Sequence, residues 1–120
     1  YILEPLVAAL NFPHFETPYC FVGHTHQPVI YELANENGDT RAREPRYGQA
    51  HNLNGQRQII NPGSVGQPRD QNPDAAYGIL NLETGVFEHR RIPYDIPDVQ
   101  RRMRAYGLPE RGATRLEHGW

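Results

Sequence analysis

Residues 19–26 read Tyr19-Cys20-Phe21-Val22-Gly23-His24-Thr25-His26, an apolar run that ends in a glycine and two histidines. The four residues before the glycine predict a short buried strand, and Gly23 releases the chain into a loop. Side chains two positions apart on an extended chain point to the same side, about 6.5 Å apart along it. We therefore predict that His24 and His26 bind one metal ion together, or one ion each of a closely spaced pair. A solvated histidine pair is the alternative for a bare motif of this kind.

Outward from this stretch, short apolar runs alternate with turns, in keeping with the eleven prolines and eleven glycines among the 120 residues. The pattern predicts a helix over 6–11, strands over 19–23, 29–33 and 58–61, and short edge strands in the polar stretch 41–54. The pairs Asn37-Gly38 and Asn54-Gly55 are typical of tight turns. We expect an α/β fold whose strand-rich part is uninterrupted.

The clearest supersecondary signal is a hairpin of residues 76–82 and 86–92 around Glu83-Thr84-Gly85. Its alternation predicts one inward-facing set (Tyr77, Ile79 and Leu82) and one set that shares a side of the return strand (Phe87, His89 and Arg91). A last helix follows Asp95, runs to about Tyr106 and ends before a glycine and a proline. We expect a domain over 1–106 and a tail over 107–120 with little order from Glu110 onward.

Composition excludes several classes of protein. The formal net charge is −2 and the pI is about 6.3, so there is no basic footprint for nucleic acid, which disfavours such a partner without excluding it. A single cysteine, Cys20, excludes an internal disulfide framework and is typical of a small buried apolar side chain. The sequence has no apolar run near 18 residues and no signal peptide, so we expect no membrane partner and a cytoplasmic location.

The order of the motifs resembles a known family. Gly23-His24-Thr25-His26, a hairpin, and then Ile60-Asn61-Pro62-Gly63-Ser64-Val65-Gly66 are similar to the C-terminal part of the calcineurin-like metallophosphoesterases, above all the bacterial phosphodiesterase type. The resemblance covers about residues 1–92. It implies the β-rich C-terminal half of an αββα sandwich, and a hydrolase that acts on phosphomonoesters or phosphodiesters. The implied partner is a phosphate-ester substrate.

The resemblance also implies a dinuclear centre of two divalent ions, manganese, iron or zinc, with His24 on the second metal and His26 on the first. Two such ions generate a hydroxide nucleophile at neutral pH and neutralise phosphoryl oxygens. Four residues are candidates for contact with the substrate phosphate: Gly23, Thr25, Ser64 and Arg69. The glycine–serine turn offers backbone amides, and an arginine offers a forked donor. A purely structural turn, and a solvated or aspartate-paired arginine, are the alternatives.

The family's other ligands lie upstream of this segment: an Asp-x-His, a bridging Asp, the Asn of a Gly-Asn-His step and a further His. None of these ligands occurs in residues 1–23, where His14 is the one residue that could substitute for them. Two imidazoles without a carboxylate hold two dications poorly, because little offsets their repulsion. We therefore expect an incomplete fragment that is inactive alone. A half-sandwich also leaves apolar surface uncovered, so we expect self-association, including as a homo-oligomer.

Two other interpretations stay open. The first is a non-catalytic remnant or interaction module of the same fold, which binds no metal. The second is an unrelated mononuclear metalloenzyme or small β-barrel, which needs a third ligand from Glu32, His51 or His89.

Overall fold

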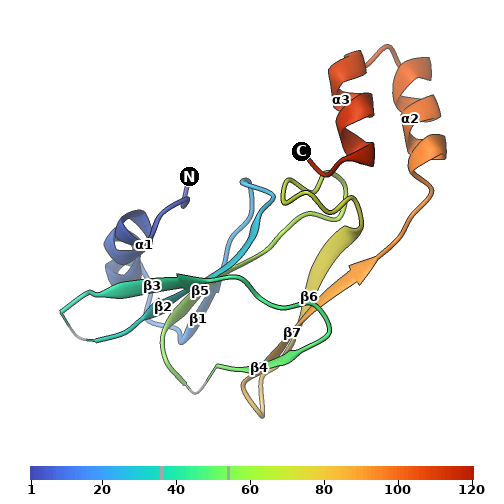
Figure 1. Cartoon of the computed structure of the whole chain (residues 1–120). Coiled ribbons are helices and arrows are strands. Elements are labelled where there is room, and N and C mark those ends of the chain that lie inside the picture. Colours follow the sequence, from blue (N-terminus) through green and yellow to red (C-terminus); the bar gives the residue numbers. More distant parts are fainter. Residues whose placement is uncertain (36, 54) are drawn as a thin grey trace.

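The structure is a computed structural model that describes residues 1–35, 37–53 and 55–120. Its strands form two sheets, as Figure 1 shows. The first sheet has the order β1-β5-β2-β3, with β1 at Tyr19–Phe21, β5 at Gln58–Pro62, β2 at Pro28–Leu33 and β3 at Thr40–Arg43. The second has the order β4-β7-β6, with β4 at Ala50–Asn52, β7 at Val86–Ile92 and β6 at Ala75–Asn81. Asn54 of the expected Asn54-Gly55 turn lies outside the described residues.

The first sheet is mixed: β1 runs parallel to β5, whereas β2 is antiparallel to both β5 and β3. Helix α1 (Pro5–Asn11) and the 3₁₀ turn η1 (Phe12–His14) cover one of its faces. Proline is compatible with the first turn of a helix, where its missing N–H has no partner to lose. Ala8 and Phe12 pack there against Tyr31 and Ile59, and the half-buried Cys20 joins this cluster as an apolar side chain.

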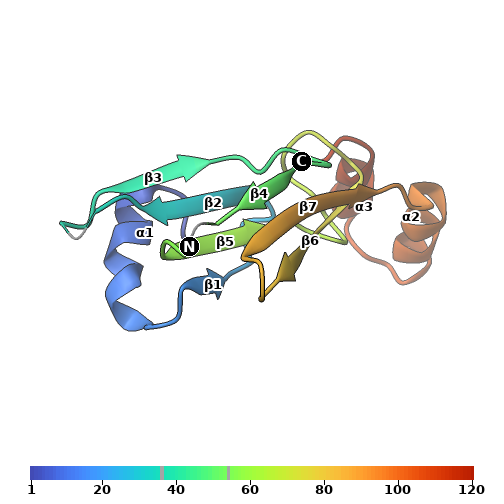
Figure 2. The same cartoon turned by 90° about the horizontal axis from the view of Figure 1, so that it is seen from below.

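The opposite face of the first sheet packs against the second sheet. Ile30 and Ile60, the neighbours of Tyr31 and Ile59 along the strands, point to this side, as alternation along a strand requires. They form a second buried cluster with Leu53 and with Phe87 of β7. The layers are therefore helix, sheet and sheet, and Figure 2 shows the second sheet lying across the first. The expected α/β, strand-rich half-sandwich is confirmed.

The hairpin forms where it was predicted, but the side chains of its first strand that face inward are the opposite set from the predicted one. Ile79 is 50% exposed and Leu82 is 80% exposed, and Tyr77 is also at the surface. The register pairs Gly78 with His89 and Leu80 with Phe87, so the even-numbered residues of β6 share the buried face of β7. Gly78 stands there because a Cβ would lie 2.3 Å from Cε2 of Phe87. Leu80 of β6 packs against the buried cluster from this face, and the predicted common face of β7 is confirmed by the burial of Phe87 and His89.

The expectation of little order from Glu110 onward is wrong. Helix α2 (Ile96–Ala105) is followed by α3 (Glu110–Thr114) and the 3₁₀ turn η2 (Arg115–Glu117), and the pair stands beyond the end of β7 in Figure 1. The buried Gln100 of α2 donates Nε2–H to the Ala113 carbonyl (3.0 Å) and to Glu117 Oε1 (2.7 Å). Ala113 and Leu116 are buried between the helices. This segment is ordered by contact with α2 and not by its own helix propensity.

Candidate metal-binding loop and the groove beside it

The loop that carries the two histidines leaves β1 at Phe21 and turns sharply. The backbone of His24 has φ 77° and that of His26 has φ 61°, both in the left-handed region. The extended conformation assumed for this pair is therefore wrong, because the strand ends before Gly23. Residues other than glycine rarely adopt such backbone angles. Strained positions of this kind cluster at functional sites, which makes the loop the first place to look for one.

The ring of His26 is oriented by a hydrogen bond to the backbone. Its Nδ1 lies 2.7 Å from the Gln67 carbonyl oxygen, and a carbonyl can only accept, so Nδ1 carries the proton. Nε2 is then the nitrogen with a free lone pair. Metal-binding histidines usually donate their other N–H to a carbonyl or carboxylate in this way. The backbone N–H of Arg69 also donates to the His26 carbonyl, at 3.1 Å, so the Gln67–Arg69 segment supports the loop from one side.

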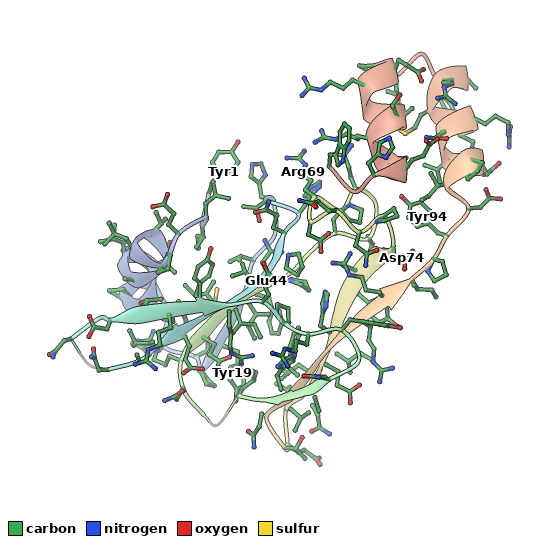
Figure 3. The ribbon with its side chains drawn as sticks, in the orientation of Figure 1. Tyr1, Tyr19, Glu44, Arg69, Asp74 and Tyr94 are labelled. Carbon is green, nitrogen blue, oxygen red and sulfur yellow. The ribbon has the colours of Figure 1, made fainter. Side chains whose placement is uncertain are left out.

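His24 is exposed and contacts an aromatic ring. The centroids of the His24 and Tyr1 rings are 4.2 Å apart, with the ring planes inclined by 47°. Tyr1 is labelled in Figure 3, on the side of the molecule where the chain begins. The exposed imidazole of His24 therefore packs against the ring of Tyr1.

Asn61, at the end of β5, fixes the conformation of the loop between the two histidines. It is 1% exposed. Its Nδ2 donates to Thr25 Oγ1 at 2.8 Å and to the Gly23 carbonyl at 3.2 Å. Its Oδ1 accepts from the backbone N–H of Gly63 at 3.0 Å. One buried amide therefore joins the histidine loop to the Asn-Pro-Gly-Ser turn. The sequence signal for this role is an asparagine that directly ends an apolar strand.

The candidate phosphate contacts differ in what their side chains already do. The Thr25 hydroxyl is buried and accepts from Asn61. Ser64 Oγ accepts from the backbone N–H groups of Gly66 (3.3 Å) and Gln67 (3.0 Å), as a serine that stabilises its own turn does. Arg69 is exposed and donates to Gln67 Oε1 at 3.3 Å, and no ion pair to it occurs within the described residues. Arg69 is thus the candidate whose charged side chain is exposed.

A groove of about 680 Å³ opens beside the loop. Thr25 and Gln27 of the loop and Arg69 line one part of it, and His89 and Arg91 of β7 line another. Arg69 and Glu44, which also line it, are labelled in Figure 3. The groove connects the histidine loop with the second sheet.

Within residues 1–35, 37–53 and 55–120, no group of three or more histidine, cysteine, aspartate or glutamate side chains is placed to hold a metal ion. The mononuclear interpretation with Glu32, His51 or His89 as third ligand is therefore wrong for the described residues. His51 instead lies 3.1 Å from Nη1 of Arg43, and His89 bonds through Nε2 to the Pro62 carbonyl at 3.2 Å. His24 and His26 lie on one loop, and the described residues place no third metal-binding side chain beside them.

Comparison with solved structures gives a match along the whole chain. A metallophosphoesterase from Sphaerobacter thermophilus, known from its crystal structure, is 43% identical, with a TM-score of 0.92. The match covers 100% of this chain and 49% of that protein. An uncharacterized protein of Methanocaldococcus jannaschii is 35% identical over 96 residues, which are 80% of this chain and 37% of that protein. This chain therefore spans half or less of the length of these relatives.

No model of a protein family matches the chain. In the part of the chain that the structure describes, none of the helices has the length and apolar character needed to cross a membrane.

Proposed function

Because the fold of this chain is that of part of a metallophosphoesterase, we propose that the protein hydrolyses phosphate esters with divalent metal ions and that this segment supplies part of the metal site. His24 and His26 are the ligands that it contributes. The observation that carries the proposal is the 2.7 Å bond from His26 Nδ1 to the Gln67 carbonyl, which leaves Nε2 as a metal-binding nitrogen. The half of the solved relative that this chain does not match is where the remaining ligands are expected.

Each residue of the loop has a distinct part in this proposal. Asn61 and Thr25 hold the loop in its left-handed conformation, so that the imidazoles are oriented before a metal arrives. Arg69 is the group of this chain that binds and orients the phosphate, because its side chain is exposed and its backbone N–H is hydrogen-bonded to the His26 carbonyl. The backbone of Gly23 and the turn of Ser64 are the other candidates for contact with the phosphate. When bound, the ions activate water and neutralise the phosphoryl oxygens.

Manganese is the first metal to test, followed by iron and zinc, and a phosphodiester is the first substrate. The alternative is a non-catalytic module of the same fold that binds no metal. Metal binding separates the two interpretations directly.

The test uses the full-length protein with His24→Asn or His26→Asn. Asparagine tolerates the left-handed region better than alanine, so these variants remove the ligand with little added backbone strain. We expect each to lower Mn²⁺ affinity in calorimetry by more than the about 10–100-fold that is typical of losing an outer-shell partner. Hydrolysis of bis(p-nitrophenyl) phosphate should fall with it.

His14→Asn is the matched control, because His14 is an exposed histidine at the end of η1, outside the loop. It should leave both measurements unchanged. Wild-type Mn²⁺ affinity in both loop variants would contradict the proposed role of His24 and His26, whereas no Mn²⁺ binding to the wild-type protein would favour the non-catalytic module.

A further inference from the structure

Three arginines come together where the C-terminal helices meet the segment that supports the histidine loop. Arg69 belongs to that segment, whereas Arg111 lies in α3 and Arg115 begins the turn η2. Arg111 and Arg115 are four positions apart in a helical stretch, so their side chains leave it on the same side. Arg69 is labelled in Figure 3 beside the lower end of these helices.

Backbone hydrogen bonds hold η2 against the chain just after Arg69. The Arg115 carbonyl accepts from the N–H of Gly119 at 3.1 Å, and the Gly119 carbonyl accepts from the N–H of Gln71 at 2.9 Å. The Arg115 side chain is half-buried and donates through Nε to the Trp120 carbonyl. The fold therefore fixes Arg115 next to the segment that carries Arg69.

The charges of the three guanidinium groups act on one another. Partial burial, and next the positive charges of Arg69 and Arg111, lower the pKa of Arg115. An arginine does not lose its proton in a protein, so the fold keeps three like charges close together. Their repulsion is relieved when an anion lies between them.

No carboxylate of the described residues lies within ion-pair distance of these three arginines. The carboxylates of the same two segments have partners of their own: Asp70 pairs with Arg91, Glu110 with Arg104, and Glu117 accepts from Gln100. Within the described ranges, the Nη groups of Arg111 and Arg115 also have no hydrogen-bond partner. The cluster thus combines uncompensated positive charge with free N–H donors.

A phosphate group matches this cluster better than a carboxylate does. A guanidinium presents a planar fork of N–H donors that fits two oxygens of either group. A phosphomonoester carries a charge of about −1.5 to −2 near pH 7 and three oxygens that accept hydrogen bonds, so it can bind more than one fork at a time. A carboxylate has a single charge and two oxygens, and it leaves more of the repulsion in place.

We propose that Arg69, Arg111 and Arg115 form one binding site for a phosphate group, and that the C-terminal helices complete this site. Arg69 contributes to it from the segment beside the histidine loop, and the two other arginines contribute from α3 and η2. The assignment of this phosphate to the ester substrate, rather than to free phosphate, rests on the proposed function.

The first experiment titrates inorganic phosphate into the full-length protein by calorimetry. Arg115→Gln and Arg111→Gln each remove one forked donor, so we expect phosphate to bind about tenfold more weakly to each variant. Arg101→Gln is the matched control, because it removes the same charge from an exposed arginine of α2 that pairs with Asp98, and it should bind like the wild type. Acetate should bind far more weakly than phosphate. No phosphate binding to the wild type, or wild-type affinity in both Arg115→Gln and Arg111→Gln, would overturn the inference.

Enzyme kinetics then identify the source of the phosphate. The KM for p-nitrophenyl phosphate and for bis(p-nitrophenyl) phosphate is compared between the wild type and Arg115→Gln. A KM raised about tenfold with little change in kcat assigns the site to the substrate, whereas an unchanged KM with weakened phosphate binding assigns it to free phosphate. Absence of hydrolysis would count against the proposed function alone, because the titration measures the site without turnover.

A last titration separates this site from the metal site. His26→Asn removes a proposed metal ligand and none of the three arginines, so it should keep phosphate binding while its Mn²⁺ affinity falls. Loss of all phosphate binding in His26→Asn would assign the phosphate to the metal ions and contradict the inference.

Discussion

Asn61 and Thr25 are joined by a hydrogen bond of 2.8 Å between Nδ2 and Oγ1, across 36 positions of the chain. The bond connects the end of β5 to the loop that follows the neighbouring strand β1. The parallel pairing of these strands brings their ends to the same edge of the sheet, so residues far apart in sequence meet there. This contact anchors the loop to the end of a strand that is remote in sequence.

Asn61→Ala should destabilise the fold and weaken the metal site. The change leaves the Thr25 hydroxyl and the Gly23 carbonyl without their buried donor, which costs about 1–3 kcal/mol of unfolding free energy. Urea denaturation measures this cost, and calorimetry measures the accompanying loss of Mn²⁺ affinity. Asn81→Ala is the control, because Asn81 also accepts backbone N–H groups but lies exposed in the hairpin. Full Mn²⁺ affinity in Asn61→Ala would show that the loop forms without this support.

Gly78→Ala should destabilise the hairpin core. The new Cβ would lie 2.3 Å from Cε2 of Phe87, a ring that is fully buried and has no room to move. We expect a loss of about 1–3 kcal/mol in chemical denaturation, as for other overpacked cores. Gly66→Ala is the matched control, since nothing lies within 4 Å of its Cβ position and its φ is not positive. Equal unfolding free energies for Gly78→Ala and Gly66→Ala would contradict this prediction. They would mean that the structure around Phe87 shifts at little cost to make room for the new Cβ.

His89 should make stability depend on pH. Burial and the Arg91 charge lower the pKa of His89 in the folded state, so the unfolded chain binds a proton more readily. The stabilisation is therefore complete above the unfolded value of about 6.5 and is lost as the pH falls below it. Denaturation of wild type and His89→Gln between pH 7.5 and about 5 should show a smaller decline in the variant. His14→Gln, at an exposed position, should follow the wild type; an identical decline in all three proteins would exclude His89 as the source.

Gln100→Ala should loosen the C-terminal helices without unfolding the sheets. It removes the two bonds that connect α2 to the Ala113 carbonyl and to Glu117. Amide hydrogen exchange over 110–117 should speed up while β2 and β5 keep their protection, because local opening does not require the core to unfold. Gln49→Ala, at an exposed position between β3 and β4, is the control. Unchanged exchange over 110–117 would show that apolar contacts alone hold α3.

Local patterns in the sequence predicted the elements well. Apolar runs gave β1, β2 and β5, the turn at residues 83–85 gave the hairpin, and α2 ends one residue before the predicted Tyr106. Each of these signals depends only on residues that are close together in the sequence, so the sequence alone is enough to detect it. In the polar stretch 41–54 only short edge strands were expected, and β3 and β4 form there on either side of Tyr47.

The errors concern contacts between distant residues. Alternation suggested that Tyr77 and Ile79 face inward, but Phe87 fills the space opposite and leaves room only for Gly78. His24 and His26 have left-handed backbones in a loop that is hydrogen-bonded to Asn61, which is remote in sequence. The order of α3 depends in the same way on Gln100.

The C-terminal segment also touches the groove. Gln71, which lines the groove, donates its backbone N–H to the Gly119 carbonyl at 2.9 Å. Gly119 lies so close to the backbone of Asn72 that a Cβ there would come within 2.7 Å of it. The next residue is Trp120, the single tryptophan of the sequence, which stacks on His118 with centroids 4.6 Å apart. Trp120 therefore directly follows a residue that is hydrogen-bonded to the wall of the groove, and its fluorescence offers a label-free optical signal for occupancy there.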